Sequence, residues 1–170
     1  VDLVKTQLRL ASGESFAAIG LDPAAPPTPC GTAVQLRINM ETMTADGQTL
    51  PSGGRLAVFD LPSGPGIRVD TFGYCGYETN AGFDSLLAKV VAHAPGGFAD
   101  ALRRAARALA EFRIEGVATN ASFLRRLIDH DDVVADRVHT RFIEEHIADL
   151  ATAQEEAGLY FAAEPAATVL

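Results

Sequence analysis

The chain has 170 residues, of which 48% are hydrophobic and 21% are charged, as expected for a globular domain with one core of ordinary size. Its net charge of -8 leaves no basic stripe to neutralise phosphates, which argues against nucleic acid as a partner. The longest apolar run, SLLAKVVAHA, contains Lys89 and is too short to cross a bilayer, so no membrane segment is expected. The two cysteines are too few for a disulfide framework, which predicts a reducing, cytoplasmic setting.

The first predicted element is a helix over residues 3–11. Leu3 and Leu8 belong to its apolar face, and Gly13 follows where a left-handed C-terminal cap would fall. This face is expected to dock on a neighbouring surface. Residues 20–30 contain four prolines and predict an irregular linker, where we place a domain boundary.

A strand is predicted over residues 31–39, because aliphatic and polar side chains alternate there with a period of two. Its core face would hold Val34, Leu36 and Ile38. Arg37 would then point away from the core, where its rigid fork of donors suits an anionic ligand better than a lysine would. A solvated polar strand face is the alternative interpretation of the same pattern.

Further strand segments are predicted over residues 55–61, 67–73 and about 85–92. The connections between them are rich in turn formers, and Asp46 and Gly47 are the favoured tight turn. Short connections of this kind predict an antiparallel meander.

After these strands the apolar residues are spaced as in helices. Apolar residues repeat at three and four over 97–112 and again over 136–150, which predicts a helix in each range. Between them, residues 112–117 predict a short extended segment, and Asn120 is a suitable N-cap for another helix. Strands first and helices later indicate an α+β domain with helices on one face of an antiparallel sheet. Little structure is expected from Thr152 onward.

The sequence contains no glycine-rich phosphate loop, nucleophile triad or histidine pair at metal-ligand spacing, so no metal site is predicted. Arg37, with an acid that could hold it, remains the candidate site. Asp84 follows a flexible bend and precedes a strand, so it could reach the exposed face of a neighbouring strand, or it could simply cap its own turn. Lys89 is expected either in solvent or with its stem along apolar surface and its charged end in water, and His93 and His139 are expected at the surface or in packing rather than as bases.

Seven segments between Val1 and about Leu150 carry further information: VDLVKTQLRLASGE, AVQLRINMET, LPSGGRL, PSGPGIRVD, GFDSLLAKVVAHA, ALRRAARALAEFRIEGVATNASFLRRLI and HTRFIEE. In this order they resemble the C-terminal part of biotin carboxylase, as found in acyl-CoA carboxylases and pyruvate carboxylase. The resemblance implies that the opening helix ends an ATP-grasp domain. The strands and helices that follow would form the final biotin carboxylase domain, of the rudimentary hybrid-motif type.

Four regions follow from this resemblance. Residues 1–19 would end the ATP-grasp domain, 20–30 would be the linker, 31–150 the biotin carboxylase C-terminal domain, and 151–170 the start of a linker to the next domain. The chain opens without an initiator methionine and reads as part of a longer protein, so the ATP lid, the metal ligands and the catalytic base would precede Val1. The chain alone is therefore expected to be inactive, with no cofactor bound.

The resemblance also implies the reaction. In that family ATP, with Mg²⁺, phosphorylates bicarbonate to carboxyphosphate, which delivers carbon dioxide to biotin on a carrier domain. Loss of a proton from the ureido nitrogen builds negative charge on the ureido oxygen, which a preorganised cation stabilises. The family's strand arginine matches Arg37, and the aspartate of its YDSL-like motif matches Asp84, which would orient the guanidinium.

The resemblance implies partners as well. Arg68 matches a position that looks like part of the family's homodimer interface. The expected partners are a biotin carrier domain, a carboxyltransferase domain or subunit, and a second copy of the chain.

Two departures from the family pattern lie near the expected site. Gln35 stands where acyl-CoA carboxylases usually carry glutamate, and residues 80–83 replace a stretch that normally has two prolines and two tyrosines. Gln35 and Phe83 would lie beside the biotin site, so these changes bear on the acceptor pocket. An alternative function follows, in which the domain is a non-catalytic module for dimerisation or assembly in a divergent carboxylase.

Overall fold

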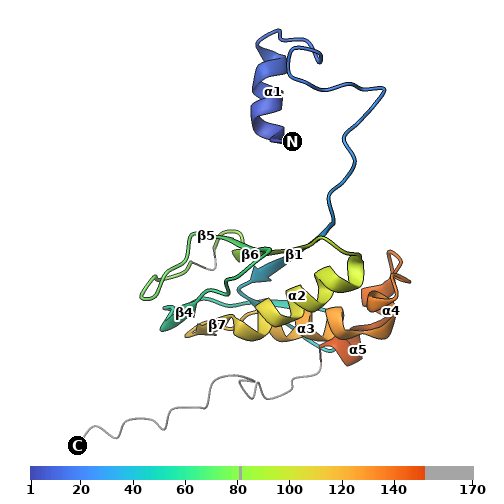
Figure 1. Cartoon of the computed structure of the whole chain (residues 1–170). Helices are drawn as coiled ribbons and strands as arrows, with labels where there is room; N and C mark the ends of the chain where they lie inside the picture. Colours follow the sequence, from blue (N-terminus) through green and yellow to red (C-terminus); the bar gives the residue numbers. More distant parts are fainter. Residues whose placement is uncertain (81, 152–170) are drawn as a thin grey trace, which may run out of the picture. The chain divides into compact units, whose positions relative to one another are not determined.

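The computed structural model describes residues 1–80 and 82–151. The chain divides into two compact units, Val1–Cys30 and the part from Gly31 onward (Figure 1). The first unit ends at Cys30, the last residue of the proline-rich segment 20–30.

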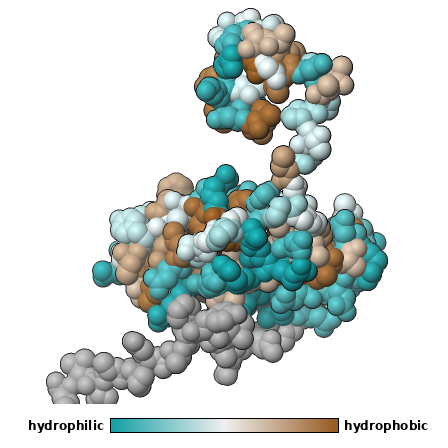
Figure 2. Space-filling view, viewed as in Figure 1, coloured by the Kyte–Doolittle hydropathy of each residue, from teal (hydrophilic) through white to brown (hydrophobic). Residues whose placement is uncertain are grey.

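The first unit contains one helix, α1 (Leu3–Ala11), as the sequence predicts. It begins where the Asp2 carboxylate accepts a hydrogen bond from the backbone N–H of Lys5, and it ends before Gly13, whose φ of 93° is left-handed. Its apolar face is open within this unit, since Leu3 and Leu8 are 72% and 67% exposed, and hydrophobic residues show at the surface in Figure 2. No other residue of the first unit covers this apolar face.

The second unit is built on antiparallel strands, which confirms the predicted α+β class. The strands are β1 (Thr32–Asn39), β2 (Glu41–Met43), β3 (Thr49–Pro51), β4 (Val58–Asp60), β5 (Ile67–Thr71), β6 (Leu86–Ala94) and β7 (Arg113–Glu115). The largest sheet has the order β1-β6-β5, so β1 pairs with a strand far along the chain, and the strands do not follow one another as one simple meander. The intervening strands have partners of their own, because β2 and β3 form a hairpin around Gly47 and β4 pairs with β7.

The helices follow mostly where their periodicity predicts, at α2 (Phe98–Glu111), α3 (Ala121–Asp129), α4 (Asp131–Val134) and α5 (Phe142–Leu150). The helix expected over 136–150 begins only at Phe142, so that prediction was wrong over its first six residues. Asp136 adopts a left-handed φ of 55° after α4, a conformation that an α-helix does not contain. The apolar spacing alone does not reveal this break.

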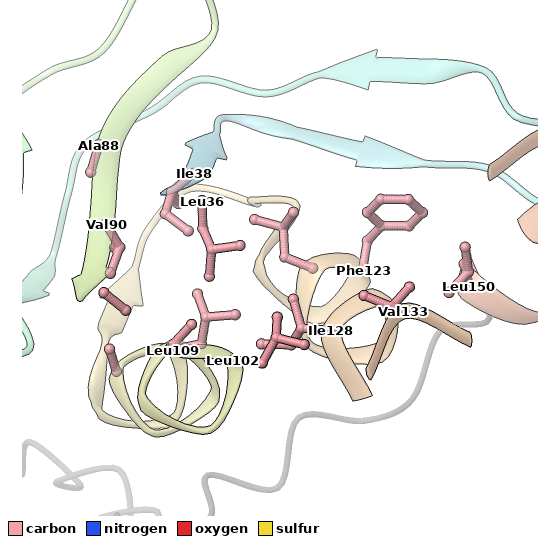
Figure 3. Close-up of a cluster of buried hydrophobic side chains, with 14 of the residues drawn as sticks. Leu36, Ile38, Ala88, Val90, Leu102, Leu109, Phe123, Ile128, Val133 and Leu150 are labelled. Atoms are coloured by element: carbon pink, nitrogen blue, oxygen red, sulfur yellow. The ribbon is translucent and has the colours of Figure 1, made fainter. Parts of the chain in front are cut away.

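One face of the large sheet packs on the helices and forms the main core (Figure 3). In this core β1 and β6 lie over α2, with α3, α4 and α5 alongside. The side chains that meet there include Leu36, Ile38, Val90, Leu102, Leu109, Phe123 and Ile128. Each large aliphatic side chain removed from water contributes about 1.5 to 3 kcal/mol. This burial fixes which residues of β1 must face the opposite way.

A smaller cluster lies on the opposite face of β6. Leu87 alternates with the core residues of its strand and packs there with Met40 and Leu56, all three being buried. Tyr77 packs against this cluster, and its backbone carbonyl accepts a hydrogen bond from the N–H of Leu56. The loop that connects β5 to β6 is thereby held over this face of the sheet.

Candidate functional site

The outward face of the sheet carries a row of charges. Arg37 on β1 is the register partner of Lys89 on β6, and Lys89 is in turn the partner of Asp70 on β5. Two like charges side by side would repel, and the acid at the end of the row offsets this repulsion. The predicted direction of Arg37 is therefore observed, and Lys89 is partly buried in the row rather than fully in solvent.

Arg37 and Asp84 lie close together, as the sequence analysis expects. Nη2 of Arg37 lies 3.8 Å from Oδ2 of Asp84, and the two side chains are 50% and 73% exposed. The other carboxylate oxygen of Asp84 accepts a hydrogen bond from the backbone N–H of Leu86 at 2.9 Å. Asp84 thus caps the start of β6 and faces the guanidinium at the same time. A pair this exposed contributes only about 0 to 1 kcal/mol to stability.

Asp84 also lines an open hollow of about 450 Å³. Phe83, which precedes Asp84, lines it and is 81% exposed. The remaining lining residues are Met40, Phe72, Tyr77, Asn80, Asp84 and Leu86. The rings of Phe72 and Tyr77 meet edge to face, with centroids 5.5 Å apart. An apolar floor next to a guanidinium and a carboxylate suits a small ring that carries a polar edge.

The sequence analysis did not single out Phe72 and Tyr77. The signal present in the sequence is the density of aromatic residues in TFGYCGY, the segment just after β5. The strand predicted over 67–73 includes Phe72, but β5 ends at Thr71, so both rings lie in a loop where alternation gives no direction. Their placement depends on the packing of Tyr77 on the smaller cluster.

Gln35 and Arg68 lie one step along the sheet from the charge row. Both are register partners of Val91, from opposite sides, and both side chains are on the outward face. Arg68 pairs with Asp70, with Nε 3.2 Å from Oδ1. Gln35 therefore neighbours Arg37 on the same strand face, whereas Arg68 lies across the sheet on β5.

The residue after Asp84 is joined to the end of β1. Ser85 donates a hydrogen bond from Oγ to Glu41 at 2.9 Å, and the other carboxylate oxygen of Glu41 accepts one from the Asn39 amide at 2.9 Å. This network connects the strand that carries Arg37 with the segment that carries Asp84. These hydrogen bonds hold the end of β1, after Arg37, next to the segment of Asp84.

His130 and Asp132, two positions apart in the sequence, meet the more distant His146 near α4 and α5. His130, Asp132 and His146 each place a possible ligand atom within 4.8 Å of the others. Each is already engaged: Nδ1 of His130 accepts from the backbone N–H of Asp132, and Nδ1 of His146 lies 2.9 Å from the Phe142 carbonyl. No local pattern in the sequence predicts this cluster, because only the folding of α3 to α5 brings His146 to the other two residues.

Arg137 holds the carboxylate of that cluster. Its Nη2 lies 2.6 Å from Oδ1 of Asp132, and this hydrogen bond is the main reason why the pKa of Asp132 is lowered. Of the histidines considered as bases, His139 lies 3.6 Å from Glu145 and His93 is exposed on β6.

Comparisons with known proteins give the chain a family. The model of the biotin carboxylase C-terminal domain matches residues 35–145. No helix in the described residues has the length and apolar character needed to cross a membrane.

Individual relatives point the same way. The chain is 40% identical over 148 residues to the biotin-dependent acyl-coenzyme A carboxylase alpha3 subunit of Mycobacterium leprae, covering 85% of this chain and 23% of the relative. It is 37% identical over 147 residues to human mitochondrial pyruvate carboxylase, covering 86% of this chain and 12% of the relative. The chain thus spans less than a third of the length of these relatives.

Solved structures share the fold as well. A single-chain, multi-domain long-chain acyl-CoA carboxylase is similar with a TM-score of 0.81 and 44% identity, over 89% of this chain and 16% of that one. The pyruvate carboxylase of Rhizobium etli has a TM-score of 0.81 and 34% identity, over 91% of this chain and 15% of that one.

Proposed function

This chain belongs to the biotin carboxylase C-terminal domain family, and from that membership we propose that it is the C-terminal part of a biotin carboxylase. The intact protein would use ATP and bicarbonate to carboxylate biotin on a carrier, within an acyl-CoA or pyruvate carboxylase. The observation that carries the proposal is Arg37, which projects from the outward face of β1 and lies 3.8 Å from Asp84, a residue that lines an open hollow.

The residues of the site fit biotin. A half-exposed guanidinium next to an open, aromatic-lined hollow can receive a neutral ring that bears a carbonyl. When bound, biotin would supply the ureido nitrogen that receives the carboxyl group.

Arg37 would donate hydrogen bonds to the ureido oxygen. Negative charge develops on that oxygen as the ureido nitrogen loses its proton, so the guanidinium stabilises the transition state more than the ground state. Asp84 would keep the guanidinium oriented, because its carboxylate forms an ion pair with Nη2 of Arg37. Phe83 would cover one side of the bound ring, and Gln35 would line the adjacent strand face.

The domain organisation follows the same proposal. Residues 1–19 would end the ATP-grasp domain, 20–30 would be a linker, 31–150 would be the biotin carboxylase C-terminal domain and 151–170 would lead to the next domain. ATP and Mg²⁺ are assigned to other parts of the intact protein. Its partners would be a biotin carrier domain and a carboxyltransferase domain or subunit.

The intact protein is expected to hydrolyse ATP in a manner that depends on both biotin and bicarbonate, whereas the 170-residue chain alone is expected not to. The reason is that Arg37 can stabilise charge on biotin but cannot bind or cleave a nucleotide by itself. Release of phosphate, measured with and without biotin and bicarbonate, tests both statements. Biotin-dependent ATP hydrolysis by the 170-residue chain alone would refute the assignment of the ATP site to the rest of the protein. If the intact protein shows no such hydrolysis, the proposed reaction is refuted.

Replacing Arg68 with glutamate is expected to shift the intact protein from dimer toward monomer. Arg68 is 71% exposed on β5, and reversing its charge would place two acids side by side, since Asp70 lies 3.2 Å away. Sedimentation velocity measures the shift. Arg141→Glu is the matched control, because Arg141 is 72% exposed and also neighbours acids. An unchanged dimer for the Arg68 variant would remove this residue from the interface and weaken the assembly role considered as the alternative function.

A further inference from the structure

Asn120 is a buried polar residue at the start of α3, only 8% exposed. It occupies the N-cap position that the sequence predicts, but its side chain makes no capping hydrogen bond. The amide instead reaches a strand that lies about eighty positions earlier in the chain. A buried amide that leaves its own helix uncapped must serve the groups to which it binds.

Those groups belong to β1 next to Arg37. Nδ2 of Asn120 donates to the backbone carbonyl of Arg37 at 3.1 Å, and Oδ1 accepts from the backbone N–H of Asn39 at 2.9 Å. The backbone N–H of Asn120 donates to the carbonyl of Asn39 at 3.1 Å. Because β1 is an edge strand, the backbone groups that point away from β6 have no strand to pair with. Asn120 takes the place of that missing strand over these two residues.

The contact falls where the strand is irregular. The register between β1 and β6 shifts between Ile38 and Asn39, one residue beyond Arg37. The burial of Leu36 and Ile38 already sends Arg37 to the outward face, so the backbone at this point affects only the angle at which the guanidinium leaves that face. The three hydrogen bonds from Asn120 hold the backbone on both sides of the shift.

We propose that Asn120 is a positioning residue that fixes the direction of the Arg37 guanidinium by clamping the backbone of Arg37 and Asn39. The inference rests on the proposed function, in which Arg37 stabilises the ureido oxygen. Asparagine suits the task because one side chain supplies a donor for the carbonyl and an acceptor for the N–H. Aspartate has the same shape, but it keeps only the acceptor and would turn a carboxylate oxygen toward the carbonyl of Arg37.

The test is a double-mutant cycle in the intact carboxylase with Asn120→Asp and Arg37→Ala. Asn120→Asp is expected to lower kcat of biotin carboxylation by about 10-fold or more, because a small misplacement of a catalytic group has effects of that order or larger. In the Arg37→Ala background the same change is expected to lower kcat no further, since its effect passes through the guanidinium. KM for ATP is expected to stay unchanged in both backgrounds.

Ile128→Val is the matched control, because Ile128 is buried on the same helix but its aliphatic side chain cannot hydrogen-bond to the backbone of β1. It is expected to lower the melting temperature while kcat stays near that of the unaltered protein. A loss of kcat for Asn120→Asp that is equal in both backgrounds, or no loss at all, would overturn the inference. If instead Arg37→Ala alone leaves kcat unchanged, the proposed function fails, independently of Asn120.

Discussion

Replacing Arg37 with alanine in the intact carboxylase is expected to lower the turnover of biotin carboxylation by about 10²-fold or more, the effect of losing one donor to a developing oxyanion. The loss should appear in kcat, because the guanidinium interacts most strongly with charge that exists only in the transition state. Steady-state rates of ATP cleavage coupled to biotin carboxylation measure it. KM for ATP should not change.

The variant Arg37→Lys separates charge from geometry. Lysine retains the positive charge but presents a single ammonium in place of the rigid fork, so we expect it to recover only part of the lost turnover. Arg103→Ala is a suitable control, since Arg103 is an exposed arginine on α2 that pairs with Asp100. Near-normal turnover of the Arg37→Ala protein would remove Arg37 from the mechanism and leave the family membership intact.

The direction of Arg37 was predictable from the sequence because it depends only on alternation. Leu36 and Ile38 must be buried, and the period of two then sends Arg37 to the opposite face. The helix α2 was predictable for a similar reason, since its apolar residues repeat with the period of a helix that packs on a sheet. Both predictions rest on burial patterns within one element.

Features that depend on contacts between distant elements were not predictable in this way. The pairing of β1 with β6, the meeting of His130 with His146, and the bonds of Asn120 to β1 all join segments that no local pattern connects. Asn120 illustrates the limit well. Its residue type correctly indicated the start of a helix. Its side chain, however, hydrogen-bonds to the unpaired backbone groups of the edge strand β1 and not to the first turn of α3.

The break before α5 has a different cause. The apolar repeat of 136–150 is genuine, since Phe142 and Leu150 are buried in the core. The segment that precedes Phe142 is instead occupied by the ion pair of Arg137 with Asp132 and by the left-handed Asp136. Local hydrogen bonds at the end of α4, among them that of the Arg137 N–H to the Asp132 carbonyl at 2.8 Å, thus interrupt a helical pattern that the apolar spacing alone would extend.

The candidate site also depends on a tight backbone crossing at Gly116. Its φ is 97°, and a Cβ at this position would lie 2.0 Å from the carbonyl oxygen of Arg55 and 2.9 Å from the backbone nitrogen of Ala57. Leu56, between these two residues, is fully buried with Met40 and Leu87. Any displacement of this segment therefore opens the smaller cluster, and Met40 of that cluster lines the hollow.

Gly116→Ala is accordingly expected to lower the free energy of unfolding by about 4 kcal/mol or more, at the upper end of single-substitution effects. The clashing atoms belong to the backbone and cannot rotate aside, so the strand pair of β4 and β7 must separate. Denaturant titration of the second unit's unfolding transition measures the change.

Gly47→Ala is the matched control for this prediction. Gly47 also has a left-handed φ, 83°, but an added Cβ would meet only the Ile147 side chain, at an ordinary 3.5 Å. Alanine there should lose only the conformational preference of about 1 to 2 kcal/mol. The difference between the two variants isolates the steric part of the effect. Equal losses at both positions would mean that left-handed strain, rather than the close approach of two backbones, accounts for the glycine at 116.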